Sequence, residues 1–204
     1  MIRSILILTL TLGISQLAAH AQISITYTGG PGESNVVNSA GTPINGDIVS
    51  IGTFTNGFIP TSTSTIAELQ GNWLNFDSTT THNILGLDGR FGATSGGVNN
   101  PAFNNKQIYL WITEGSGNNI TEYGLFTSTN PDWTFPLNNS ALPTNPIDSN
   151  EVNTFIFGDG ILGSGGSTPG SLQTLAVAVV PEPGSLSILA LGGLLLAGAR
   201  ARRR

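Results

Sequence analysis

Between residues 22 and 178 the apolar residues come in short stretches, each interrupted within a few positions by Gly, Pro or Asn. Ile23, Ile25 and Tyr27 alternate with polar residues, which is the period of a strand with one buried face. Gly, Asn, Ser and Thr are abundant while Lys and Glu are scarce, a composition that favours strands joined by turns over long surface helices. We therefore expect an all-β domain, most simply an antiparallel β-sandwich of jelly-roll type with one short helix.

The clearest pair of strands lies at residues 107–113 and 122–127, joined by the turn-forming segment 115–119. Aliphatic side chains occupy one face of the first strand, namely Ile108, Leu110 and Ile112. Tyr109 and Trp111 occupy the other face. Because both faces carry large apolar side chains, we expect both to be covered, by a second sheet or by a helix.

The same reasoning places other elements along the chain. Further strands are expected at 48–54, 153–157 and 172–180. Between residues 64 and 76 the apolar spacing changes to three and four residues, with Ser64 or Thr65 available as the N-cap, which predicts a short helix. The segments 77–105 and 158–170 are rich in turn formers, so we expect loops there, with at most one short strand in the first.

The first 21 residues have the three parts of a secretory signal peptide in the usual order. Arg3 supplies the positive start, residues 5–12 form an apolar core, and Ala19 and Ala21 form a cleavage site of the A-x-A type. The mature chain is expected to begin at Gln22.

The charged residues are distributed unevenly. Five of the seven basic residues lie at the two ends, so only Arg90 and Lys106 accompany the twelve acidic residues of the central segment. That segment, residues 22–183, carries a net charge of about −10, which argues against nucleic acid as a partner. Cysteine is absent, so an exported domain would be stabilised by its apolar core or by bound ions, without disulfides.

An apolar run at residues 184–199 precedes a cluster of arginines at the end of the chain. As a helix this run would span roughly 24 Å, somewhat less than the ~30 Å of a hydrocarbon core. The cluster consists of Arg200, Arg202, Arg203 and Arg204. Its long side chains can reach the phosphate layer, and clustered Arg is retained on the cytoplasmic side. We therefore expect a transmembrane helix over 184–199 that anchors a precursor in the inner membrane.

Two prolines separate this helix from the domain. Pro181 and Pro183 disfavour both helix and strand, so the segment around them should be extended and accessible to a processing enzyme. A plain membrane anchor that begins with prolines is the alternative. The Pro-Glu-Pro motif, the short apolar run and the terminal arginines together resemble the PEP-CTERM sorting signal of exported bacterial proteins.

This resemblance covers residues 179–204 and leaves residues 22–178 as the exported β domain. It implies that an exosortase-type enzyme in the membrane recognises Pro181, Glu182 and Pro183 and removes the tail. The protein would then reach the cell surface or an extracellular polysaccharide matrix. The segments 107–112, 122–126 and 133–136 are similar to parts of uncharacterised exported proteins with the same tail, a likeness that implies no activity.

Residues that could carry chemistry are few. His82 is the only histidine after signal removal and cysteine is absent, so neither a catalytic triad nor an ordinary zinc site is indicated. A glycosidase needs only two carboxylates, and the candidates are Asp88, Glu114, Glu122, Asp132, Asp148 and Asp159. Calcium could take oxygen ligands from Asp148, Asn150 and Glu151, or from Asp159, but neither stretch matches a known calcium loop. The sequence identifies no cofactor and no metal site.

Three functions follow from these observations. The first is a non-enzymatic component of the cell surface or of an exopolysaccharide matrix. The second is a carbohydrate-binding module. Trp73, Trp111 and Trp133 could stack on sugar rings if they are exposed, with Trp111 and Trp133 as the candidate pair, although tryptophans in a small β domain more often fill the core. The third is a secreted glycan-acting enzyme, which would need two carboxylates in one cleft.

Overall fold

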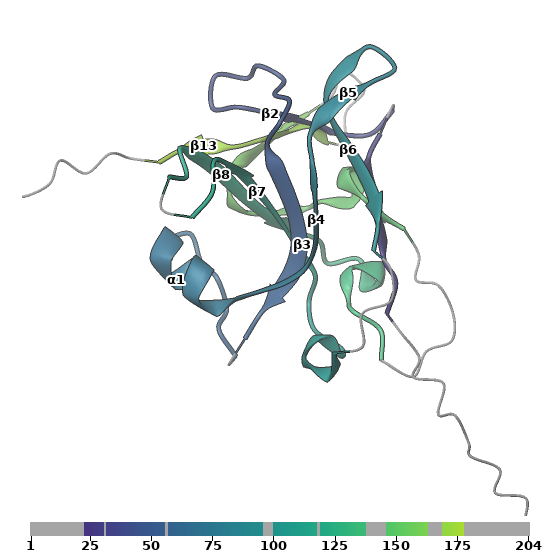
Figure 1. Cartoon of the computed structure of the whole chain (residues 1–204), viewed down its shortest axis with the longest axis vertical. Coiled ribbons are helices and arrows are strands. Elements are labelled where there is room, and N and C mark those ends of the chain that lie inside the picture. The colour runs from purple at the N-terminus through teal and green to yellow at the C-terminus, as the bar shows by residue number, and fades with distance from the viewer. Residues whose placement is uncertain are drawn as a thin grey trace, which may run out of the picture.

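The computed structural model describes residues 23–30, 32–55, 57–95, 100–117, 119–137, 146–162 and 169–177. Their strands form three sheets (Figure 1). The four-stranded sheet has the order β5 (His82–Ile84), β6 (Leu87–Thr94), β1 (Thr26–Gly29) and β9 (Ile147–Asp148). The three-stranded sheet has the order β11 (Asp159–Leu162), β12 (Pro169–Gln173) and β2 (Asn35–Val37). An all-β fold is thereby confirmed.

The six-stranded sheet is the centre of the molecule. Along it lie β10 (Thr154–Phe157), β8 (Glu122–Thr127), β7 (Tyr109–Glu114), β3 (Ile48–Phe54) and β4 (Trp73–Thr80), and β13 (Leu175–Ala176) pairs with β8. The one α-helix among the described residues, α1 (Ile66–Asn72), lies on one side of this sheet and β6 on the other (Figure 1). Short 3-10 helices are η1 (Pro101–Phe103), η2 (Pro131–Trp133) and η3 (Ser149–Glu151).

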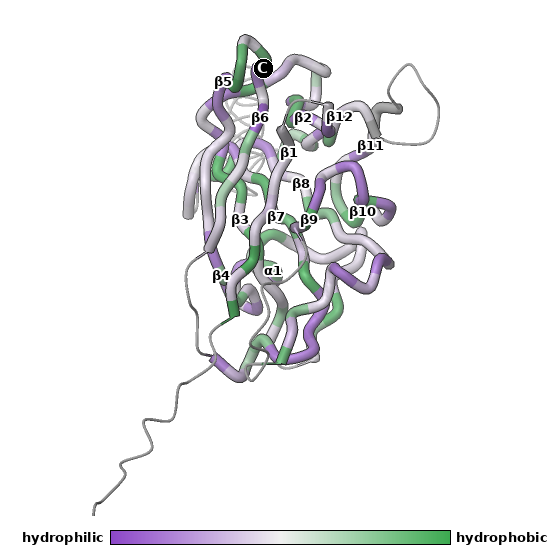
Figure 2. The backbone as a smooth tube through the Cα atoms, turned by 90° about the vertical axis from the view of Figure 1, so that its right-hand side faces the viewer, coloured by the Kyte–Doolittle hydropathy of each residue, from purple (hydrophilic) through white to green (hydrophobic). Residues whose placement is uncertain are grey.

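Apolar side chains cover both faces of the six-stranded sheet, as the alternation in residues 107–113 predicts. On the inner face, Leu110 and Ile112 belong to a core that also contains Tyr27 and Phe91 of the four-stranded sheet. On the outer face, Trp111 packs in a second cluster, to which α1 contributes Leu69. Figure 2 shows the alternation of hydrophobic and hydrophilic residues along the strands.

The elements defined by local signals are confirmed. The hairpin of β7 and β8 forms, and β3 has the predicted bounds. Helix α1 begins after Thr65, whose side chain and that of Glu68 form a capping box. The helix ends earlier than the spacing predicts, because Trp73 pairs with Phe54 as the first residue of β4.

The two segments expected to be loops contain strands, so those expectations were wrong. Residues 77–105 include the end of β4 and all of β5 and β6, and the segment 158–170 includes β11 and the start of β12. Strand β6 buries one large apolar side chain, Phe91, and pairs with β1 along its last four residues. A pattern of apolar residues therefore could not reveal it.

The sheets also contain parallel pairs, which an antiparallel sandwich did not predict. Strand β1 pairs in parallel with β9, and β12 pairs in parallel with β2. The described part of the expected strand at 172–180 is divided at Thr174, which is fully buried and donates its backbone N–H to Val37 O, while residues 178–180 lie outside the described residues. At this residue the chain passes from the three-stranded to the six-stranded sheet.

Among the described residues, no helix has the length and apolar character needed to cross a membrane. The predicted signal peptide with Ala19 and Ala21, and the predicted transmembrane helix at 184–199, lie outside the described residues.

Candidate binding groove

A groove of about 280 Å³ lies on the outer face of the six-stranded sheet. Strands β3, β4 and β7 contribute Ile48, Ser50, Trp73, Asn75, Ser78, Trp111 and Thr113 to its lining. Helix α1 contributes Gln70, and the turn between β7 and β8 contributes Ser116, Gly117 and Ile120. None of these side chains carries a charge.

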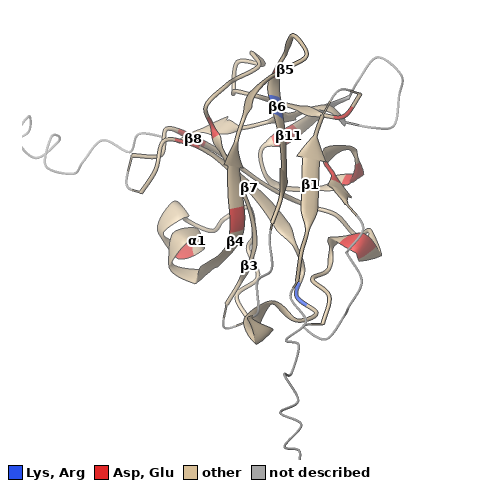
Figure 3. Ribbon diagram, turned by 45° about the vertical axis from the view of Figure 1, so that its right-hand side comes forward, with Lys and Arg blue, Asp and Glu red and all other residues tan. Residues whose placement is uncertain are grey.

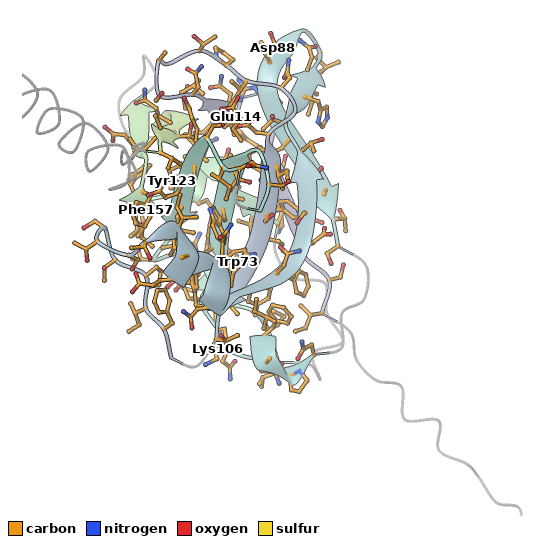
Figure 4. The ribbon with its side chains drawn as sticks, turned by 60° about the vertical axis from the view of Figure 1, so that its left-hand side comes forward. Trp73, Asp88, Lys106, Glu114, Tyr123 and Phe157 are labelled. Atoms are coloured by element: carbon orange, nitrogen blue, oxygen red, sulfur yellow. The ribbon has the colours of Figure 1, made fainter. Side chains whose placement is uncertain are left out.

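Trp73 forms one wall of this groove and is half-buried. A Cβ atom on Gly52 would lie only 2.7 Å from the Trp73 ring, so the glycine gives the indole room to lie across the sheet. Phe54 and Trp111 meet this ring edge to face, with centroids 5.3 and 5.1 Å away. The indole is thus fixed in place beside the last turn of α1 (Figure 4).

Hydroxyl and amide groups form a connected row along β4 and β3. Asn75 Oδ1 accepts a hydrogen bond from Trp73 Nε1 and another from Ser78 Oγ, both at 3.3 Å. The hydroxyls of Ser78 and Ser50 lie 2.9 Å apart. Across the groove, Gln70 Nε2 donates to Gly117 O at 2.7 Å, which holds α1 against the β7–β8 turn.

The two tryptophans expected to stack on sugars are buried, which corrects that part of the carbohydrate-binding hypothesis. Trp133 is fully buried and its Nε1 donates to Glu151 Oε2 at 3.0 Å. Trp111 is 5% exposed and lines the groove, with its ring centroid 5.1 Å from that of Trp73. Neither offers a ring face to solvent. Trp73, the third tryptophan considered for sugar stacking, was expected on the apolar face of the helix and instead begins β4.

The indole N–H of Trp111 is buried and has no acceptor among the described residues. Nearly all buried polar groups in proteins have a partner, so an unpaired donor is unusual. Because Trp111 lines the groove, a molecule bound in the groove could supply the acceptor.

A second hollow, of about 230 Å³, lies near the other end of the same face. Phe58, Ile59, Lys106 and Tyr109 are among its lining residues. Burial raises the pKa of Tyr109 above its ordinary value. Neither this hollow nor the groove is lined by a carboxylate or a histidine.

Three carboxylates form a row at one end of the six-stranded sheet. Glu114 of β7 and Glu122 of β8 are paired with each other. Asp47 directly precedes Ile48, which pairs with Thr113, the residue before Glu114. Glu122 accepts hydrogen bonds from Ser39 and Thr174. These bonds outweigh the effect of burial and lower the pKa of Glu122.

Asp47 is the buried member of the row. It is 5% exposed, and its Oδ2 has no hydrogen-bond partner among the described residues. Burial first, and then the charges of Glu114 and Glu122, raise the pKa of Asp47 from 3.8 to about 6. No local pattern indicates this residue, because its burial depends on the pairing of β3 with β4 and β7.

The raised pKa of Asp47 predicts a pH-dependent stability. An acid whose pKa is higher in the folded than in the unfolded chain stabilises the fold while protonated, so this contribution is complete below pH 3.8 and is lost as the pH rises through 6. Asp47→Asn should therefore raise the free energy of unfolding by about 2 kcal/mol at pH 8 and leave it unchanged at pH 3.5.

Urea unfolding of the purified protein across this pH range measures the effect. Asp88→Asn is the matched control, because hydrogen bonds from Asn45 and Asn83 lower the pKa of the exposed Asp88 and its replacement should not stabilise the fold. Equal stability of wild type and Asp47→Asn at pH 8 would contradict the prediction.

The other candidate carboxylates lie apart from the groove and take part in turns and caps. Acidic residues are spread over several elements (Figure 3). Asp88 accepts hydrogen bonds from Asn45 and Asn83, each at 2.7 Å. Asp132 lies in η2, and Asp159 accepts from the backbone of Gly160.

The residues considered for calcium and for catalysis have other contacts. Asp148 and Glu151 form the capping box of η3, and Glu151 also accepts from Trp133 and Asn130. His82 is exposed on β5, with its Nδ1 2.9 Å from Thr80 O. Within the described ranges, no three His or acidic side chains are grouped so that they could hold a metal ion.

Comparison with known proteins identifies the C-terminal segment. The family model of the PEP-CTERM protein-sorting motif matches residues 179–204. No curated protein and no solved structure matches the chain. The matched segment contains Pro181, Glu182 and Pro183 and the terminal arginines, all of which lie outside the described residues.

Proposed function

We propose, from the PEP-CTERM sorting motif that this chain carries at residues 179–204, that the protein is a non-enzymatic component of the cell surface or of an extracellular polysaccharide matrix. The motif marks an exported protein that is sorted through the membrane and processed by an exosortase. Its destination and its lack of catalytic activity are the parts that we add to this. The uncharged lining of the groove supports the lack of catalytic activity, because glycan hydrolysis needs a pair of carboxylates beside the substrate.

The folded domain ends close to the motif, which constrains how processing can occur. Strand β13 ends at Ala176, and the backbone N–H of Val177 still donates to Thr121 O at 2.8 Å. The four Cα-to-Cα steps from Val177 to Pro181 can span at most about 14 Å. The domain of an anchored precursor therefore lies next to the membrane surface, and the processing enzyme must reach the motif between the two.

A triple substitution tests the delivery route. With Pro181, Glu182 and Pro183 all replaced by Ala, the protein expressed in its native host should keep its C-terminal arginines and remain in the membrane fraction. Wild type should lose the tail and leave that fraction. Mass spectrometry of the intact protein measures the difference.

A protein with Pro143 and Pro146 replaced by Ala is the matched control, since these prolines lie outside the motif. It should be processed like wild type. Removal of the same tail from the triple variant would show that the Pro-Glu-Pro residues do not direct processing.

We also propose that the domain is a jelly-roll-like sandwich. The common core of the four-stranded and six-stranded sheets supports this architecture. The parallel pairs of β1 with β9 and of β12 with β2 are departures from that architecture.

A further inference from the structure

We propose that the groove lined by Trp73, Asn75 and Trp111 binds a short stretch of a neutral polysaccharide. This inference rests on the proposed matrix function and names the ligand class that the domain would hold. The sequence suggested the three tryptophans for sugar stacking, with Trp111 and Trp133 as the chosen pair, but it did not bring Trp73 together with Asn75, Ser78 and Ser50 in one groove.

The charge of the groove selects the class of ligand. The protein has a net charge of −5, yet the residues that line the groove carry neither acidic nor basic side chains. Anionic chains such as nucleic acids or uronic acid polymers would find no cation there, while the overall charge would repel them. An uncharged ligand with many hydroxyl groups is not repelled by the negative charge of the protein.

Trp73 provides the apolar surface that a sugar ring needs. A pyranose presents C–H groups on its faces, and an indole packs against such a surface while keeping a polar edge. Phe54 and Trp111 meet the Trp73 ring edge to face, and Gly52 allows it to lie across the sheet. Because these contacts already order the side chain, little rotamer entropy would be lost on binding.

The polar groups of the groove offer donors that lack acceptors. Asn75 is exposed and its Oδ1 accepts two hydrogen bonds, which orients the amide so that its nitrogen has no partner among the described residues. The buried indole N–H of Trp111 also lacks an acceptor in this part of the chain. A hydroxyl group can accept from one such donor and donate to Ser50 or Ser78, so sugar hydroxyls match this arrangement.

The size of the groove limits the length of chain that it holds. Its volume of about 280 Å³ lies at the lower end of the range for small-molecule sites. We therefore expect contact with one or two sugar rings and weak binding at each site, which repetition along a polymer would strengthen.

Binding of the purified full-length protein in detergent micelles to a polysaccharide panel tests this inference. The neutral probes are cellulose, mannan, dextran, xylan and galactan, and the anionic probe is alginate. We expect affinity electrophoresis to show retardation by at least one neutral polymer and none by alginate. Trp73→Ala should weaken that binding about tenfold or more, since stacking and burial of the ring together exceed about 1.4 kcal/mol.

Two further variants keep the test decisive if Trp73→Ala does not fold. Asn75→Ala and Ser78→Ala change exposed side chains, and each should weaken binding several-fold. Ile59→Ala is the matched control, because Ile59 is 75% exposed and lines the other hollow, and it should bind like wild type. Failure of every neutral polymer to bind, binding of alginate alone, or unchanged binding by the Asn75 and Ser78 variants would each overturn the proposal.

The test is separate from that of the delivery route. Groove variants should still lose the C-terminal tail in the native host, since none of the substitutions lies in residues 179–204. Loss of binding with normal processing concerns the groove alone, and loss of processing with normal binding concerns the sorting motif alone.

Discussion

Replacing Trp133 by alanine should lower the free energy of unfolding by about 3–5 kcal/mol, because it removes a fully buried indole from the main core. The tryptophan side chain also donates a hydrogen bond to Glu151, which is part of the capping box of η3. Its loss would leave a cavity and deprive a half-buried carboxylate of one partner. Urea denaturation of the purified protein, followed by circular dichroism, measures the change.

Trp133→Phe separates the two contributions. The phenyl ring fills most of the space but cannot donate to Glu151, so we expect a loss of about 1–2 kcal/mol. The backbone carbonyl of residue 133 still accepts from Ile108 N and Gln107 Nε2 in both variants. An alanine variant within about 1 kcal/mol of wild type would show that the core collapses around the site or that the packing differs from that described.

Gly158→Ala should destabilise the domain by about 3 kcal/mol. Gly158 has a φ of +98°, which costs an L-residue roughly 1–2 kcal/mol, and it joins β10 of the six-stranded sheet to β11 of the three-stranded sheet. A Cβ atom there would also clash with the carbonyl of Gln173 and lie 2.8 Å from the Phe126 ring. Overpacking of this kind typically costs a further 1–3 kcal/mol.

Gly46→Ala is a closely matched control for this substitution. Gly46 has a φ of +97°, but a Cβ atom there would have no heavy atom within 4 Å. Only the conformational cost should appear, about 1–2 kcal/mol. The difference in unfolding free energy between the two variants, measured by thermal unfolding, gives the cost of the steric contacts at Gly158, where the two sheets approach each other. Equal destabilisation by both would mean that the junction at Gly158 has room for a side chain.

The parts of the fold that the sequence predicts are those set by neighbouring residues. The strands around the 115–119 turn were predictable because their apolar alternation and the turn lie within about twenty residues. Helix α1 was predictable because Thr65 and Glu68 cap it locally. Such signals do not depend on the rest of the chain.

The missed elements depend on distant partners. Strand β2 has three residues and pairs with β12, which follows it by more than a hundred residues. Strand β6 contains two glycines and is ordered by its pairing with β1. Local propensity in such segments favours turns, and only the completed sheet outweighs it.

The candidate groove was hidden for the same reason. Trp73, Asn75 and Ser78 share one face only because β4 has a bulge opposite Ile51 and Gly52, which shifts the alternation between Asn75 and Asp77. In a regular strand Asn75 and Ser78 would point to opposite faces. The sorting motif, by contrast, is a linear signal that requires no folded structure, so its residues could be recognised directly.

The pairing of the two ends of the domain limits how its sheets can form. Asn35 and Ser171 are hydrogen-bonded although 136 residues separate them, so this contact closes a loop that contains most of the domain. Strand β2 pairs with β12, so until the two strands meet β2 has an unpaired edge that could join a neighbouring chain. Strand β13 ends three residues before the matched motif, so the last described strand lies directly before the sorting segment in the chain. The three-stranded sheet therefore cannot be completed until residues from both ends of the domain are present together.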